Sequence, residues 1–398
     1  MRSDPLDYLS RELDALKQQG LYRQLRVLEG EQSHKSTFDH RQVVNLSSNN
    51  YLGLTTHPRL REKALEAVRV LGVGSGSVRS IAGTMDIHLE LERRLAAFKK
   101  TEAVVVFQSG FAANAGTVAA VLSSEDVVIS DQLNHASIID GARLSRATIK
   151  VFPHKDVDAA RKILQELPAG QRKLLITDGV FSMDGDLGAV PELCALAEEY
   201  GCIMMVDDAH ASGVFGANGR GTIDHFGAHG RVDIQVGTLS KAIGALGGYV
   251  AGSKALIEFL YHRARPFLFS TSHPPSVAAA CIAAVDVLER EPAIIERLWE
   301  NTRFFKAGLK ALGFNTGLSE SPITPVIAGD GALAMRLSDR LFQEGVFAQG
   351  IAFPTVARDK ARVRTIVTAS HTRDELQFAL DVFAKVGREL GLIGTMNS

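Results

Sequence analysis

The most informative stretch about the fold class is KLLITDGVFSMDGDLGAVPELCALAEEYGCIMMVDDAH, residues 173–210. Two short apolar runs, at residues 173–177 and 203–206, lie on either side of a helix that we expect to begin at Pro191. Proline is favoured in the first turn of a helix, where its missing N–H removes no hydrogen bond. Short apolar runs separated by helices are typical of parallel strands in a sheet with both faces covered. The stretch therefore predicts an α/β fold built on a mostly parallel sheet.

The same alternation of strand and helix continues on both sides of this stretch. A helix of small residues is expected from Ala112, directly after the first apolar run. The other strands expected in the sheet are residues 103–107, 127–130, 233–237 and 248–251.

The two ends of the chain differ from this central pattern. Near the N-terminus, leucines recur every three or four residues, which predicts an amphipathic helix: Leu6, Leu9, Leu13 and Leu16. After about residue 285 helices predominate, with strands expected near 324–327 and 362–367, and TRDE at 372–375 is a capping box. We expect three parts: an N-terminal helix and arm (1–45), a large domain (46–285) and a smaller α+β domain (286–398).

Composition and charge argue against several classes of function. The 398 residues include 44 Lys and Arg against 45 Asp and Glu, so no general affinity for nucleic acid or anionic membranes is expected. The longest apolar run, residues 277–285, is far shorter than the ~18 residues of a membrane span. Three cysteines form neither a disulfide framework nor a metal-binding pattern. We therefore expect a cytoplasmic protein with no signal peptide and no metal.

Two glycine-rich segments could bind a phosphate. GVGSGSVRSIAGT, residues 72–84, has serine where a dinucleotide fingerprint needs its third glycine. QSGFAANAG, residues 108–116, follows an expected strand and opens an expected helix. Free N–H groups at such a helix N-terminus bind anions, and Gly110 and Phe111 would direct their amides at a phosphate. A simple packing turn of small residues is the alternative for this segment.

A lysine and a carboxylate complete the pattern. VDDAH at residues 206–210 places Asp207 and His210 at a strand end, where open α/β sheets bind ligands. TLSKA at 238–242 places Lys241 in an apolar, glycine-flanked stretch, although lysine is rarely buried without a partner. A lysine able to form a Schiff base, a strand-end acid and a phosphate cradle are what pyridoxal 5′-phosphate (PLP) requires. The pKa of Lys241 must then fall toward neutrality.

The chain resembles the α-oxoamine synthases, fold-type I PLP enzymes that condense an amino acid with an acyl-CoA. The resemblance covers nearly the whole chain. The blocks that carry it are LSSNNYLGL, SGFAAN, SDQLNHASIIDGARL, TDGVFSMDGD, VDDAHASGVFGANGRGT, GTLSKA, RPFLFSTS and ARVRTIVTASHT.

This resemblance implies roles for residues around the cofactor ring. Lys241 would hold the cofactor as a Schiff base and later take the Cα proton of the substrate. Asp207 would pair with the pyridine nitrogen, His210 and Ser182 would contact the phenolic oxygen, and His135 would stack on the ring.

The resemblance also implies roles at the phosphate and the substrates. The phosphate would be held by Gly110, Phe111, Thr238 and Ser240, and by Ser270 and Thr271 from the other subunit of an obligate homodimer. Arg364 would bind the amino-acid carboxylate in a bidentate fork, assisted by Asn49. Arg23 resembles a substrate-side arginine of some members, with a solvated charge at a helix end as the equal alternative.

Within this family, the substrates are the open question. VRSIAGTMDIHLELE (78–92) and NHASIIDGARL (134–144) look most like glycine C-acetyltransferase, so we expect glycine and acetyl-CoA to give 2-amino-3-ketobutyrate. SGFAAN and STSHPP are closer to 8-amino-7-oxononanoate synthase, the alternative, which joins alanine to a pimeloyl thioester with loss of CO2. Ala352 stands where some of those synthases carry arginine, although Thr355 matches them.

Two rival classes of function fit the sequence less well. A nucleotide-dependent dehydrogenase would share the α/β pattern, but the glycine fingerprint is missing. A non-catalytic regulator on this fold would need a fused DNA-binding domain, for which 45 leading residues leave little room.

Overall fold

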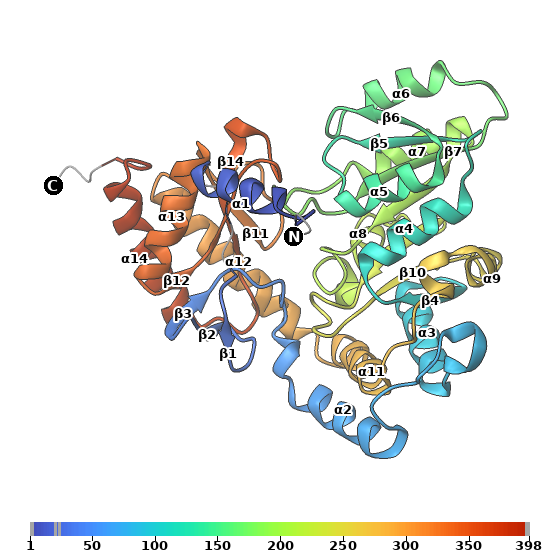
Figure 1. Cartoon of the computed structure of the whole chain (residues 1–398), viewed down its shortest axis with the longest axis horizontal. Coiled ribbons are helices and arrows are strands. Elements are labelled where there is room, and N and C mark those ends of the chain that lie inside the picture. Colours follow the sequence, from blue (N-terminus) through green and yellow to red (C-terminus); the bar gives the residue numbers. More distant parts are fainter. Residues whose placement is uncertain (1–3, 20–21, 23–24, 395–398) are drawn as a thin grey trace.

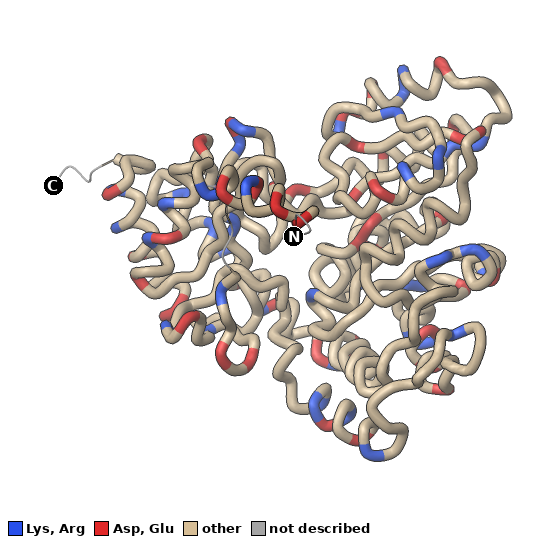
Figure 2. Tube along the Cα trace, in the orientation of Figure 1, with Lys and Arg blue, Asp and Glu red and all other residues tan. Residues whose placement is uncertain are grey.

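The computed structural model describes residues 4–19, 22 and 25–394. A large region around one long sheet lies beside a smaller region that contains two short sheets (Figure 1). Lysine and arginine are interspersed with aspartate and glutamate along both regions (Figure 2). In the described part of the chain, no helix has the length and apolar character that a membrane crossing needs.

The large region is built on a seven-stranded sheet, as counted over the described residues, in the order β4-β10-β9-β8-β7-β5-β6. The pairs from β9 to β6 are all parallel, and β10 is antiparallel to both of its neighbours. The strands are β4 Ala103–Phe107, β5 Val127–Asp131, β6 Thr148–Phe152, β7 Lys173–Asp178, β8 Ile203–Asp207, β9 Ile234–Thr238 and β10 Gly248–Gly252. The predicted α/β fold with a mostly parallel sheet is confirmed.

Successive residues of each central strand are buried against helices on opposite faces of the sheet. Leu174 and Ile176 of β7 belong to the core beneath α4, α5 and α9, whereas Leu175 belongs to the core beneath α6 and α7. This is why the strands read as continuous apolar runs. The helices of the region are α3 Asp86–Lys99, α4 Gly110–Val121, α5 Ala136–Ser145, α6 Val157–Gln165, α7 Val190–Tyr200, α8 Thr222–His225, α9 Lys254–Arg263 and α10 Arg265–Leu268.

The smaller region combines segments from both ends of the chain. β3 pairs in parallel with β12, which joins residues near the N-terminus to the C-terminal part. One sheet has the order β1-β2-β3-β12 (Leu28–Glu29, Lys35–Phe38, Arg41–Asn45, Val346–Phe347), and the other β11-β14-β13 (Ile323–Gly329, Ala361–Ile366, Gln349–Ile351). Its helices are α12 Ala293–Ala311, α13 Gly331–Gln343 and α14 Arg373–Glu389. The domain boundaries after residues 45 and 285 stay predictions.

Three further α-helices lie in the described part of the chain, together with the short 3-10 helices Leu54–Thr56, Ala217–Gly219 and Arg358–Lys360 and the π-helix Arg79–Gly83. The leucine-patterned segment near the N-terminus forms α1 (Tyr8–Gln18), as predicted, and it lies against the smaller region in Figure 1. Helix α2 (Pro58–Leu71) packs on α11 (Pro275–Arg290) below the large sheet.

The carboxyl ends of β5, β7, β8 and β9 lie at the same edge of the sheet, because these parallel strands run in one direction. Asp178 and Asp207 are the last residues of β7 and β8 and are directly paired in register. Asp131 ends β5 and Thr238 ends β9 at the same edge. Polar side chains from four strands therefore meet where ligands bind in this class of sheet.

Candidate active site

A cavity of about 170 Å³ lies at this carboxyl edge of the sheet. It receives side chains from the ends of β7, β8 and β9 and from the beginnings of α4 and α5. The lining residues are Gly110, Phe111, Asn114, His135, Ser137, Asp178, Val180, Ser182, Asp207, Ala209, His210, Thr238 and Lys241. The structure thus brings together every residue that the sequence predicted around a cofactor ring.

Lys241 lies in the short link between β9 and β10. Burial lowers the pKa of its ammonium to about 8, with a further lowering by the positive charge of Arg364. The carboxylates of Asp207 and Asp178 oppose this shift. A lysine with such a pKa supplies an appreciable fraction of neutral amine near neutral pH, which both a nucleophile and a proton acceptor require.

Asp207 is held in one orientation by two hydrogen bonds. The side-chain amide of Asn114 donates to Oδ2 at 2.6 Å, and the backbone N–H of Ala209 donates to Oδ1 at 2.8 Å. The side chain is 4% exposed. A buried carboxylate fixed in this way suits a cationic partner on the cavity side.

His210 lies in the turn after β8 and pairs with a tyrosine. Its Nδ1 is 2.8 Å from the hydroxyl of Tyr51. Burial, and then the nearby charges of Lys241 and Arg364, hold the pKa of His210 well below its usual range. The imidazole is therefore neutral at physiological pH and can donate or accept one hydrogen bond in the cavity.

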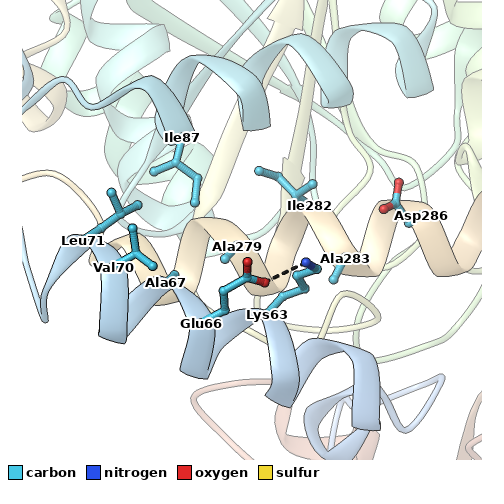
Figure 3. Close-up of a pocket in the computed structure, with 10 residues that line it drawn as sticks. All are labelled: Lys63, Glu66, Ala67, Val70, Leu71, Ile87, Ala279, Ile282, Ala283 and Asp286. Atoms are coloured by element: carbon cyan, nitrogen blue, oxygen red, sulfur yellow. Dashed lines mark hydrogen bonds and ion pairs between the residues drawn. The ribbon is translucent and has the colours of Figure 1, made fainter.

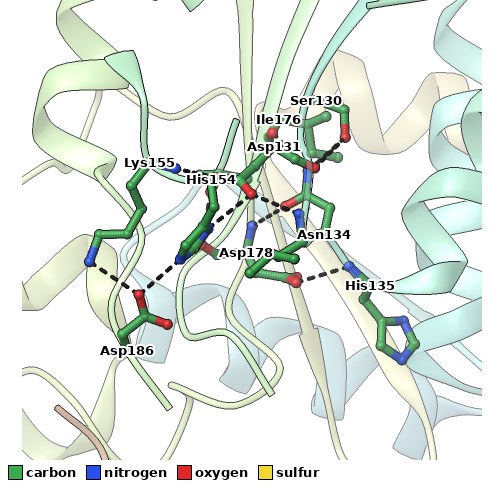
Figure 4. Close-up of polar contacts among 11 residues, drawn as sticks. Ser130, Asp131, Asn134, His135, His154, Lys155, Ile176, Asp178 and Asp186 are labelled. Carbon is green, nitrogen blue, oxygen red and sulfur yellow. Dashed lines mark hydrogen bonds and ion pairs between the residues drawn. The ribbon is translucent and has the colours of Figure 1, made fainter. Parts of the chain in front are cut away.

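A chain of polar contacts connects the histidine on α5 to the strand-end acid. The hydroxyl of Ser137 is 2.7 Å from His135 Nδ1 and accepts a hydrogen bond from Asn114 at 2.9 Å. Asn114 in turn donates to Asp207. The backbone N–H of His135 donates to Asp178 Oδ2 at 3.0 Å (Figure 4). The ring of His135 is exposed on the cavity side and thus offers a flat face to a ligand.

The N-terminus of α4 forms the opposite end of the cavity. Ser109 caps the helix by accepting from the N–H of Ala112 at 3.0 Å. Gly110 and Phe111 line the cavity. A Cβ on Gly110 would lie 3.5 Å from the Cβ of Thr238, so the helix start and the end of β9 are close together. Ser240 donates its backbone N–H to Thr238 Oγ1 at 3.2 Å and stands just outside the lining. First-turn amides beside hydroxyl groups are a suitable environment for a phosphate.

Arg364 extends from β14 in the smaller region toward this cavity. Its Nη1 donates to the carbonyl oxygen of Ser182 at 3.2 Å, and burial lowers the pKa of the guanidinium. Its buried Nε, and the buried Oδ1 of Asn49, have no hydrogen-bond partner among the described residues. Buried polar groups without partners are rare, so both atoms are available to a ligand.

Other predicted residues lie elsewhere. Ser270 and Thr271, predicted to reach the site of the other subunit, do not line this cavity, and Thr271 pairs with Val78 in an isolated bridge. Thr355 lines a different cavity, next to Ala352 in the smaller region. Arg23 lies outside the described residues.

Four residues of the site were missed by the sequence reasoning: Tyr51, Asn114, Ser137 and Asp178. Asn114 carried a usable signal, because it is the one amide in the otherwise small and apolar helix GFAANAGTVAAV. Asp178 also carried one, since it ends an apolar strand just as Asp207 does.

The donor set fits PLP. A helix N-terminus with Thr238 suits its phosphate, the Asp207 carboxylate suits a protonated pyridine nitrogen, and the Lys241 amine lies in the same cavity. In the described part of the chain, no group of three or more His, Cys, Asp or Glu side chains could hold a metal ion.

Comparisons with known proteins agree with this chemistry. Residues 41–383 match the model of the aminotransferase class I and II family. The chain is 62% identical over 97% of its length to an 8-amino-7-oxononanoate synthase of Symbiobacterium thermophilum and 56% identical over 97% to 8-amino-7-oxononanoate synthase 1 of Bacillus subtilis, in each case covering 99% of the relative.

Solved structures are also similar. A serine palmitoyltransferase from S. paucimobilis, solved with PLP and myriocin bound, superposes with a TM-score of 0.93 at 33% identity, covering 98% of this chain and 100% of that one. An 8-amino-7-oxononanoate synthase from Francisella tularensis gives a TM-score of 0.72 at 29% identity, covering 86% of this chain and 97% of that one.

The expectation of glycine C-acetyltransferase is wrong. Curated relatives that are 53–62% identical over nearly the full length are named 8-amino-7-oxononanoate synthase. Neither of the two blocks that suggested it lines the cavity that contains Ala352 and Thr355. In residues 78–92, Arg79 and Glu92 form a buried ion pair at 2.9 Å, and residues 134–144 form nearly all of α5. Such residues support the framework and the cofactor side, so they say little about the acyl group.

Both the site and the comparisons lead to one assignment. The chain belongs to the aminotransferase class I and II family and, within it, to the α-oxoamine synthases, PLP-dependent acyltransferases of fold-type I that use an amino acid and an acyl thioester.

Proposed function

We propose that this enzyme joins alanine to a pimeloyl thioester, with loss of CO2 and release of the thiol, to form 8-amino-7-oxononanoate. The observation that carries the proposal is the near full-length identity of 53–62% to relatives of that name. Lys241 and Asp207 line one cavity, and Arg364 is near enough for its charge to lower the pKa of Lys241. This combination supports the proposal, because the reaction needs a proton acceptor, a charge partner for the ring and a carboxylate-binding group.

When bound, PLP supplies an electron sink for the carbanion that forms at the substrate Cα. Lys241, as the neutral amine, accepts the Cα proton on its Nζ. Asp207 keeps a negative charge beside the ring nitrogen, and its bond from Asn114 prevents it from turning away. His210 and Ser182 would hold the phenolic oxygen, and His135 would stack on the ring.

At the phosphate end, the amides of Gly110 and Phe111 would hold the dianion. The hydroxyls of Thr238 and Ser240, which donate to the carbonyl of Gly247 in this structure, would turn to join them. At the substrate end, Arg364 grips the carboxylate of alanine. Its planar fork presents two parallel N–H donors, and the orphaned Nε supports this role. Asn49, whose buried Oδ1 has no hydrogen-bond partner among the described residues, assists Arg364 through its side-chain amide.

The acyl chain lies in a second cavity of about 900 Å³ between α1 and the smaller region. Apolar lining by Leu16, Met335 and Phe353 suits the methylenes of the chain. Arg358 also lines this cavity, with its guanidinium 4.3 Å from the centre of the Phe353 ring. Arg358 supplies a positive charge for the distal carboxylate of the pimeloyl chain. Ala352, which stands where some synthases carry arginine, cannot supply that charge. Thr355 and Arg23 stay predicted as further substrate contacts.

The active unit is a homodimer in the cytoplasm, with Ser270 and Thr271 reaching the phosphate of the partner's site. Support comes from exposed apolar side chains beside these residues: Val73 is 79%, Ile81 82% and Phe269 68% exposed. The N–H of Ser272 donates to the carbonyl of Ser77 at 3.1 Å and so joins the two segments.

An apolar groove of about 360 Å³ between α2 and α11 continues this surface. In Figure 3, Val70, Leu71, Ile87 and Ile282 face the groove, and the Lys63–Glu66 ion pair lies at its rim. A second copy of the chain is the occupant that this apolar surface fits best.

The test is turnover by the purified enzyme with a panel of substrates. Alanine with pimeloyl-CoA should give 8-amino-7-oxononanoate, identified by mass, with stoichiometric CO2 from the alanine carboxyl group. Serine with palmitoyl-CoA is the matched alternative suggested by the structural neighbours. Turnover of that pair, and none with alanine and a pimeloyl thioester, would contradict the proposal. Arg358→Ala should raise KM for the pimeloyl thioester but not for a monocarboxylic thioester of the same length.

A further inference from the structure

The loop between β7 and α7, residues 179–188, carries Ser182 to the cavity. It is shaped by its own backbone, because the N–H of Phe181 donates to the carbonyl of Asp186 at 3.0 Å and the N–H of Gly185 donates to that of Phe181 at 2.8 Å. The loop is therefore a compact turn, and its Val180 and Phe181 side chains are buried.

On one side, the loop accepts hydrogen bonds from two arginines of β14. Arg364 donates to the carbonyl of Ser182 at 3.2 Å, and Arg362 donates to the carbonyl of Met183 at 2.9 Å and to Asp184 at 2.6 Å. The N–H groups of residues 320 and 321 donate to the carbonyl of Gly185. The place of the loop thus determines where the guanidinium of Arg364 lies.

On the other side, His154 connects the loop to the large sheet, beside the contact of Lys155 with Asp186 and the hydrogen bond from Gly179 N–H to the carbonyl of Asp207. His154 Nε2 lies 2.9 Å from Asp186 in the loop, and its Nδ1 lies 3.0 Å from Asp131 at the end of β5 (Figure 4). Both ring nitrogens face carboxylates, which only accept hydrogen bonds. Both nitrogens must therefore carry a proton, and the bridge is an imidazolium ion between two anions.

The surroundings of His154 favour that charged form. Burial opposes it, but the hydrogen bonds and charges of Asp131 and Asp186 raise the pKa of His154 to about 9. Lys155 Nζ also lies 3.3 Å from Asp186 and 3.7 Å from Glu320, and the Phe181 ring packs edge-on against the imidazole at 4.3 Å. Asp131 is a firm anchor, since the backbone N–H groups of Leu133 and Lys155 also donate to it, each at 2.9 Å.

The same network reaches the other side of the cavity. Asn134, three residues after Asp131, accepts the N–H of Asp178 at 2.8 Å, and Asp178 accepts the N–H of His135 at 3.0 Å (Figure 4). The anchor of His154 is thus continuous with the elements that orient His135.

We propose that His154 is a positioning residue, which clamps the 179–188 loop between Asp131 and Asp186 and so sets Arg364 for the amino-acid carboxylate. The part that concerns the carboxylate rests on the function proposed above. His154 does not line the cavity, so it acts through the loop rather than on the substrate.

Three variants and one control test this proposal. His154→Gln replaces the imidazolium with a neutral side chain that can donate to only one of the two carboxylates, and Asp186→Asn removes the charge of the partner in the loop. The double variant closes a mutant cycle. His229→Gln is the matched control, because His229 is similarly exposed (27% against 23%), pairs with Asp224 at 2.9 Å and does not line the cavity.

Hydrogen–deuterium exchange, measured on cofactor-free protein, gives a readout that needs no turnover. Amides in residues 179–188 should exchange faster in His154→Gln than in the wild type at the same pH, while β7 and β8 keep their protection. In the holoenzyme, KM for alanine should rise ~10- to 100-fold, as expected when a binding group is displaced by about 1 Å, with KM for the thioester nearly unchanged. The double variant should be no worse than either single variant.

Unchanged exchange in residues 179–188 would overturn the proposal, as would an alanine KM equal to that of His229→Gln. Loss of protection across the whole sheet would also overturn it, since His154 would then be a general stabilising residue. A wild-type enzyme that does not use alanine would instead contradict the proposed function. The exchange experiment would still test whether His154 holds the 179–188 loop.

Discussion

Lys241 determines both how the cofactor is attached and which group accepts the substrate proton. We expect Lys241→Ala to bind PLP only non-covalently and to lose turnover, because both roles need its amine. Borohydride reduction followed by peptide mass mapping should find the cofactor on Lys241 in the wild type and on no lysine in the variant. Lys254→Ala removes a 76% exposed lysine and should behave as the wild type. Wild-type turnover by Lys241→Ala would refute this role.

Asp207 offers a test of the electron sink that needs no acyl thioester. Asp207→Asn should retain the cofactor but slow the exchange of the alanine Cα proton in deuterated water, because an amide cannot stabilise the positive charge of the ring. Proton NMR of alanine measures this exchange directly. An unchanged exchange rate would reduce Asp207 to a structural cap for the turn at Ala209.

Arg364 should discriminate between the two substrates. Arg364→Ala removes the cation that we propose pairs with the alanine carboxylate in a buried site. We therefore expect a loss of ~2–5 kcal/mol in transition-state binding. At 1.36 kcal/mol per tenfold change, this is roughly a 30- to 5,000-fold lower kcat/KM for alanine. Steady-state kinetics should show a far smaller change in KM for the thioester. Equal losses for both substrates would place Arg364 away from the carboxylate.

Which residues could be found from sequence follows from how local their signal is. Lys241 and Asp207 stand out because each interrupts or ends an apolar run. Tyr51 gave no such sign, since its partner His210 is 159 positions away and only the fold brings them together. Arg364 was placed only by resemblance to known enzymes, because its neighbours in the site come from another region of the chain.

At the level of elements, the capping box on α14 was readable from sequence and is confirmed. Thr372 accepts the N–H of Glu375 at 3.2 Å, and Glu375 accepts the N–H of Thr372 at 2.9 Å. Thr372→Ala should lower the free energy of unfolding by about 1 kcal/mol, measured by urea denaturation. Thr372→Ser keeps the hydroxyl and should restore most of it. Equal stability of the alanine variant and the wild type would show that the box contributes nothing.

The link between β5 and the 179–188 loop makes stability depend on pH. The folded pKa of His154, about 9, lies above its ordinary value of 6.5. The stabilisation of at most about 3 kcal/mol is therefore fully present below pH 6.5 and is lost as pH rises through 9. Urea denaturation at pH 6.5 and pH 9.5 should show a smaller difference for His154→Gln than for the wild type. A difference of equal size in both proteins would contradict the linkage.

Some elements could not be predicted because their residues resemble those of loops. β6 is an edge strand whose residues are mostly exposed, so TIKVF lacks the apolar run of its neighbours. The β2–β3 hairpin is built from KSTF and RQVVN, whose polar residues hide the pattern. The antiparallel direction of β10 follows from its short link to β9, since a parallel connection needs a dozen or more residues.

For the whole molecule, the short π-helix Arg79–Gly83, on which Ile81 is exposed, should decide the assembly state. Ile81→Asp places a charge in the proposed dimer surface, so we expect monomers in size-exclusion chromatography with light scattering. These monomers should lose PLP more readily during dialysis, because Ser270 and Thr271 would no longer reach the partner's phosphate. Leu318→Asp changes a residue of similar exposure, 84% against 82%, in the smaller region and should leave the dimer intact. A dimeric Ile81→Asp would refute this surface.

The central position of β10 also sets an order of events during synthesis. β10 lies between β9 and β4, so Val250 pairs with both Val236 and Val105. In a nascent chain that ends before residue 248, β4 and β9 each have an unpaired edge where β10 will lie. The segment 239–247, which carries Lys241, is then attached only to β9. Open edges recruit other strands, so the chain is exposed to misassembly during this interval. Insertion of β10 pairs both edges and, in the same step, fixes the second end of the segment that carries Lys241.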